Sequence, residues 1–113
     1  MFKMRREQMA AFREDALRGF EDRVAAHVQR CFARRWSALQ EDGVRGLIRR
    51  GVERAAAHGI VAERDVCLFI DLMLVFGAGF DREQAWAREI LEAPALDPSA
   101  KTRALYAHGM EEA

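Results

Sequence analysis

The fold is decided by the most hydrophobic stretch of the chain, Ile60 to Phe76, which contains Val66-Cys67-Leu68-Phe69-Ile70-Asp71-Leu72-Met73-Leu74-Val75-Phe76. By propensity alone, Val66 to Ile70 could form a strand. However, no second convincing strand is present to pair with it, and the flanking segments show a helical period. A short helix that is apolar on nearly all sides is a buried central helix. We therefore predict a central helix over about residues 62–76, with the other helices packed around it.

The segments before this stretch predict two helices. The first is expected from about Arg5 to about Phe32, because apolar residues recur there at every third or fourth position. These residues are Met9, Phe12, Ala16, Phe20, Val24, Val28 and Cys31. Residues 33–42 are less regular. A second helix is expected to begin near Asp42 and to end at His58-Gly59, where glycine readily takes the left-handed conformation.

The segments after the central stretch predict two more helices. Residues 77–79, Gly-Ala-Gly, should end the central helix, and Asp81 is expected to cap the next helix in a capping box with Gln84. That helix would end at Pro94 and place inward the side chains of Trp86, Ile90 and Leu91. Residues 97–98, Asp-Pro, should start the last helix. Leu105 and Tyr106 would dock this helix, while Gly109 and the acidic tail fray. The fold class is therefore all-α, a compact bundle of about five helices.

Length and charge describe one domain with an uneven charge distribution. The chain has 113 residues, half of them apolar, which suits a single helical domain over residues 1–113. Its net charge of zero argues against a dedicated DNA-binding protein. Residues 1–54 hold 13 Lys/Arg and 8 Asp/Glu, a net charge of +5. Residues 55–113 hold 5 Lys/Arg and 10 Asp/Glu, a net charge of −5. Either the halves attract each other, or a basic face meets an acidic partner.

The sequence predicts a cytoplasmic location and no membrane association. The N-terminus lacks the apolar region of a signal peptide. The longest apolar stretch is interrupted by Asp71 and is shorter than the ~20 residues of a membrane-spanning helix. Cys31 and Cys67 are isolated and set among apolar residues, so we expect both to be reduced core residues.

No catalytic, cofactor-binding or metal-binding set is predicted. His27 and Cys31 are four residues apart, a spacing that two metal ligands can use, but the remaining His and Cys residues show no second paired spacing. Packing roles are therefore expected for both. The Gly-Ala-Gly of residues 77–79 resembles the start of a dinucleotide-binding loop but lacks the third glycine. Nucleophile-elbow, P-loop and zinc-protease motifs are missing, so we do not expect an enzyme.

Asp71 is the most unusual residue, because it lies within an almost entirely apolar helix. A buried carboxylate is costly unless it is paired or hydrogen-bonded. We predict a structural role for Asp71, with its partner among Arg49, Arg50, Arg54 and Tyr106.

Two groups of residues are candidate partner-binding positions. Arg45 and Arg49 belong to an arginine-rich helix that could touch phosphates. The alternative, favoured by the neutral net charge, is a solvated face or pairing with the acidic C-terminal half. The apolar side chains of Phe2, Met4 and Met9 could engage a partner as a helix in a groove, or could instead cover the domain's own core.

Short segments along nearly the whole chain carry a family resemblance. They are Arg5-Arg6-Glu7-Gln8-Met9, Phe20-Glu21-Asp22-Arg23, Gly51-Val52-Glu53-Arg54-Ala55, His58-Gly59-Ile60, Glu63-Arg64-Asp65-Val66-Cys67, Phe69-Ile70-Asp71-Leu72-Met73-Leu74-Val75-Phe76-Gly77, Trp86-Ala87-Arg88-Glu89-Ile90-Leu91 and Leu105-Tyr106. In these segments the chain resembles a family of small helical accessory proteins encoded in bacterial type VI secretion gene clusters, beside spike (VgrG-type and PAAR-type) and effector genes. The resemblance implies a protein-binding adaptor or chaperone that loads cargo onto the spike.

Two other functions remain open at this point. A helical nucleic-acid-binding regulator would use the arginine-rich second helix in a helix-turn-helix-like arrangement, and its affinity would fall steeply with salt. A small immunity protein would neutralise a toxin encoded nearby.

Overall fold

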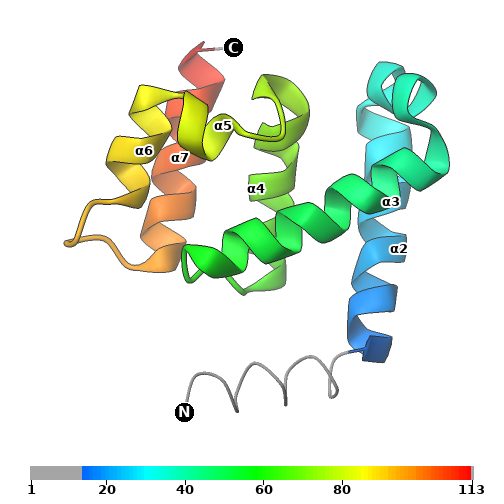
Figure 1. Cartoon of the computed structure of the whole chain (residues 1–113), viewed down its shortest axis with the longest axis horizontal. Helices are drawn as coiled ribbons and strands as arrows, with labels where there is room; N and C mark the ends of the chain where they lie inside the picture. Colours follow the sequence, from blue (N-terminus) through cyan, green and yellow to red (C-terminus); the bar gives the residue numbers. More distant parts are fainter. Residues whose placement is uncertain (1–13, 113) are drawn as a thin grey trace.

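Residues 14–112 form six α-helices and contain no strand in the structure, a computed structural model that describes this part of the chain (Figure 1). The helices are α2 (Glu14–Cys31), α3 (Ala33–Ala57), α4 (Glu63–Phe76), α5 (Phe80–Glu83), α6 (Ala85–Leu91) and α7 (Pro98–Glu112). The predicted all-α compact fold is confirmed. There is one helix more than expected in the described range, because the short α5 is separate from α6.

Helix α4 lies at the centre, as predicted for residues 62–76 (Figure 1). It contacts α3, α5 and α7. Its buried side chains are mainly apolar: Val66, Phe69, Ile70, Leu72, Met73 and Leu74. One face is only half-buried, however, and carries Cys67, Leu68 and Asp71. Asp71 therefore lies on the least buried face of the central helix, which explains how a carboxylate is tolerated there.

Two glycines allow the close approach of α4 to its neighbours. A Cβ added at Gly51 would lie 2.6 Å from Cγ1 of Ile70, and one added at Gly109 would lie 2.7 Å from Cδ2 of Leu72. The absent side chains bring α3 and α7 against α4. Gly109 is accordingly buried within α7, which continues to Glu112. The prediction that the chain frays at Gly109 is wrong, because packing on α4 outweighs the low helix propensity of glycine.

The N-terminal helices follow the predicted pattern with two differences. Phe20, Val24 and Val28 are buried on α2, but Cys31 is exposed and not a core residue. Helix α3 is interrupted at Gln40, where the backbone is not helical (φ 63°), so its long part begins directly after Gln40, as predicted for a helix that starts near Asp42. The second difference is that the preceding residues, from Ala33, are also helical. The part of the predicted first helix before Glu14 lies outside the described residues.

Predicted helix ends are confirmed at Gly59, Gly77 and Pro98, whereas α6 ends at Leu91 and not at Pro94. Gly59 (φ 79°) and Gly77 (φ 107°) follow α3 and α4 in conformations with positive φ. Helix α7 begins at Pro98, and the carboxylate of Asp97 accepts a 2.8 Å hydrogen bond from the backbone N–H of Ala100. Asp81, in contrast, is not a cap. It lies inside α5 and makes tertiary contacts instead.

No helix in the range 14–112 is both long enough and apolar enough to cross a membrane.

Candidate functional site

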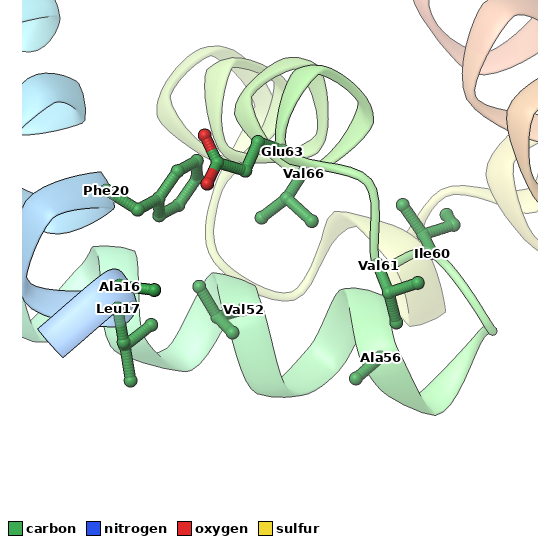
Figure 2. Close-up of a pocket in the computed structure, with 9 residues that line it drawn as sticks. All are labelled: Ala16, Leu17, Phe20, Val52, Ala56, Ile60, Val61, Glu63 and Val66. Carbon is green, nitrogen blue, oxygen red and sulfur yellow. The ribbon is translucent and has the colours of Figure 1, made fainter. Parts of the chain in front are cut away.

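An apolar groove opens where α2, α3 and the start of α4 meet (Figure 2). Its volume is about 70 Å³, enough to take an apolar side chain rather than a large ligand. Glu63 is the only charged side chain among the lining residues, which are Ala16, Leu17, Phe20, Val52, Ala56, Ile60, Val61, Glu63 and Val66. The groove is therefore a hydrophobic surface site.

The local fold explains why these side chains meet. Val52 and Ala56 are four residues apart on α3, so both lie on one face and form the floor along the helix direction. The turn at Gly59 then carries the chain over the end of α3 and places Val61 at the rim, 52% exposed. Phe20 closes the groove from α2 (Figure 2).

One ion pair stands beside the groove. Arg23 Nη2 donates to Glu63 Oε1 at 2.6 Å, and it joins α2 to the first turn of α4. Both side chains are well exposed, so the pair contributes little to stability. It does neutralise the one carboxylate of the groove, which leaves the site apolar in character.

The predicted partner-binding arginines belong to a cluster that joins α2 to α3. Buried Glu21 accepts hydrogen bonds from Arg45 Nη1 at 2.9 Å and from Arg49 Nε at 2.7 Å. Arg45 also donates to Asp22 and Glu41. Burial would raise the pKa of Glu21, but the two guanidinium groups outweigh this effect and hold it below its usual range. Arg45 and Arg49 of α3 thus hold α2 in place through Glu21.

The two arginines differ in what they leave accessible. Arg45 is held by three carboxylates, whereas the side chain of Arg49 is 68% exposed and donates to Glu21 alone. Intramolecular pairing was one of the two predicted alternatives. We predicted that the acidic partners lie in the C-terminal half of the chain. This is wrong for Arg45 and Arg49, since Glu21 lies in the N-terminal half. A role of Arg49 in partner binding stays a prediction.

A second buried network joins the end of α3 to α5. The carboxylate of Asp81 accepts hydrogen bonds from Arg54 Nη2 at 2.6 and 2.7 Å and lies 3.0 Å from His58 Nε2. Burial would raise the pKa of Asp81, but the hydrogen bonds from Arg54 and His58 keep it below its ordinary value. Arg54 thus pairs across the basic and acidic halves, as the charge distribution suggested.

The predicted partner of Asp71 is wrong. Its Oδ1 lies 2.9 Å from Nε2 of His27 on α2, and Arg49 and Arg54 pair elsewhere. The side chain of Asp71 is 13% exposed. Burial raises its pKa above the ordinary value, and His27 offsets this only in part. We expected an arginine or the Tyr106 hydroxyl as the partner because Asp71 lies in an apolar helix, but the half-buried face of α4 that carries Asp71 meets His27 of α2.

Cys67 completes a group of three potential ligands. The ligand atoms of His27, Cys67 and Asp71 all lie within 4.8 Å of one another. Burial, with smaller contributions from Asp71 and Cys31, raises the pKa of the Cys67 thiol to about 11. The thiol is thus protonated at neutral pH and is not a reactive nucleophile. The spacing along the sequence suggested His27 and Cys31 as a pair of ligands. It could not reveal that Cys67 and Asp71 of α4 lie beside His27.

Phe2, Met4 and Met9, the other predicted partner-binding residues, lie outside the described residues. No family model, curated protein or solved structure matches the chain.

Proposed function

We propose that this protein is a non-enzymatic protein-binding module, an adaptor or chaperone-like accessory that loads a spike or effector protein of a type VI secretion apparatus in the cytoplasm. The observation that carries the proposal is the apolar groove between α2, α3 and α4 (Figure 2). The resemblance of the chain to secretion accessory proteins supports the class of partner.

The shape and chemistry of the groove favour an amphipathic helix as its occupant. The floor follows the axis of α3 through Val52 and Ala56, and Phe20 and Val61 form two walls. A linear apolar groove of this kind receives apolar side chains that repeat along one face of a partner helix. Such side chains would cover Val61, which is otherwise half-exposed.

The arginine contacts support this proposal over nucleic-acid binding. A regulator that used α3 against phosphates would need its cations free. Arg45 and Arg54 are instead held by carboxylates within the fold. We therefore favour the apolar groove over the basic face as the binding surface.

Substitution of Ala56 tests the proposal. Ala56 is exposed and lines the groove, so Ala56→Arg should place a large charged side chain in the site without disturbing the core. We expect the affinity of this variant for a purified type VI spike or effector protein that binds the unaltered chain to fall at least about 30-fold, the loss typical of a blocked interface centre. Val61→Asp, at the exposed rim, should weaken the same complex.

Ala57→Arg is the matched control. Ala57 is also exposed and lies in the same turn of α3, but it does not line the groove. We expect Ala57→Arg to bind as the unaltered chain does, measured by calorimetry or surface plasmon resonance. Equal binding by both arginine variants would exclude the groove as the site, and no binding of any spike or effector protein would contradict the proposed function.

A further inference from the structure

A histidine, a cysteine and an aspartate converge between α2 and α4. His27 comes from α2, while Cys67 and Asp71 are one turn apart on α4 and share a face. Their ligand atoms all lie within 4.8 Å of one another. We propose that these three side chains form a binding site for one divalent transition metal ion of the zinc class, which ties α2 to α4.

The spacing of the three groups is close to that of a coordinated ion. Bonds of about 2.0–2.3 Å in a tetrahedral zinc site place neighbouring ligand atoms roughly 3.3–3.7 Å apart. His27 Nε2 and Asp71 Oδ1 are 2.9 Å apart, joined by a hydrogen bond that coordination would replace. Side-chain adjustments of roughly 1 Å would bring all three atoms to bonding distance.

The donor types select the class of ion. An imidazole nitrogen, a thiolate sulfur and a carboxylate oxygen are the three donors found in zinc sites. Calcium and magnesium instead prefer oxygen ligands throughout. A fourth position would be filled by water.

The ion has a path to the site from solvent. A surface hollow of about 230 Å³ reaches His27 and Cys67 between α2 and the start of α4. Arg23 and Arg64 also line it, and the charge of Arg23 is balanced by Glu63 at 2.6 Å. The hollow therefore allows a cation to approach His27 and Cys67, two of the three ligands.

The position of the site gives the ion a structural effect. Both α2 and α4 pack against α3, and polar side chains bridge them directly at His27–Asp71 and Arg23–Glu63. Coordinate bonds from His27 on one helix and from Cys67 and Asp71 on the other would join the two helices far more firmly than these hydrogen bonds. We expected no metal site from the spacing of His and Cys along the chain, because these three ligands come together only in the fold.

Titration with Co²⁺, a spectroscopic substitute for zinc, tests the site directly. The full chain, freed of metal by a chelator and kept reduced, should bind one Co²⁺ and show the near-ultraviolet absorption of a thiolate–cobalt bond. One equivalent of Zn²⁺ should remove that absorption and raise the unfolding temperature. The absence of any thiolate–cobalt absorption with excess Co²⁺ in the unaltered chain would overturn the proposal, whatever the variants do.

Two variants locate the ligands. Cys67→Ser should abolish the thiolate–cobalt absorption and lower the Zn²⁺ affinity at least about 100-fold, as the loss of a metal ligand does. His108→Gln is the control, because His108 lies on α7 and outside the cluster. Far-ultraviolet circular dichroism verifies that both variants are folded. Absorption that survives Cys67→Ser, or is lost in His108→Gln, would contradict the assignment.

Discussion

Single residues show how tertiary contacts override local sequence signals. Asp81 has the sequence position of a helix cap, yet its side chain is only 1% exposed and pairs with Arg54 and His58. Local spacing cannot reveal a pairing over more than twenty residues. The same reason explains why the contact of Asp71 with His27, 44 residues away, was not predicted.

Removal of the Asp81 charge should destabilise the fold. Asp81→Asn leaves the Arg54 guanidinium without its counter-charge, and the cost should be about 3 kcal/mol, at the low end for a broken buried pair because Arg54 keeps some contact with water. Urea unfolding at neutral pH measures this difference. A cost below about 1 kcal/mol would show that the pair contributes no more than a surface ion pair.

The contribution of Asp81 should also depend on pH. Its pKa in the folded protein lies below the ordinary value of 3.8, so the charged form stabilises the fold above that pH. This stability is lost as the pH falls from about 4 through the lower, folded-state pKa. The difference in unfolding free energy between Asp81→Asn and the unaltered chain should therefore shrink in acid. A difference that stays constant down to pH 2 would contradict the depressed pKa.

At the scale of helices, two glycines of α3 should respond to alanine in opposite directions. At Gly51 a Cβ would lie 2.6 Å from Ile70 on α4, so Gly51→Ala should separate the helices and cost about 1–3 kcal/mol. At Gly46 the nearest atom is the flexible Arg50 guanidinium at 3.6 Å. Gly46→Ala should therefore stabilise the protein by up to about 1 kcal/mol through helix propensity. Thermal unfolding measures both, and equal shifts in the same direction would contradict the close approach of α3 and α4.

The sequence predicts an element well when the residues that determine it are close together along the chain. The central helix and the ends at Gly59, Gly77 and Pro98 follow from composition, glycine conformation and proline geometry, and were predicted. The break at Gln40 lies in the stretch that we expected to be less regular, residues 33–42, but its positive φ was not predicted, because a positive φ at a non-glycine residue has no sequence signature. Lining residues of the groove come from three segments, so only the fold brings them together.

At the scale of the whole molecule, three arginines of α3 pair with carboxylates of the same chain. Arg45 and Arg49 join α2 to α3, and Arg54 joins α3 to α5. A complex formed through the apolar groove should accordingly change its affinity only a few-fold between 50 and 500 mM salt. Nucleic-acid binding would instead weaken by orders of magnitude over this range. Isothermal titration at both salt concentrations distinguishes the two, and a steep salt dependence would favour the basic face.

We propose that the groove between α2, α3 and α4 binds a protein partner. Titration of the isotope-labelled chain with an unlabelled spike or effector protein, followed by NMR spectroscopy, tests this proposal directly. We expect the largest amide shifts around Phe20, Ala56 and Val61, which line the groove. Shifts centred on the exposed Arg49 face instead, or no shifts with any spike or effector protein, would contradict it.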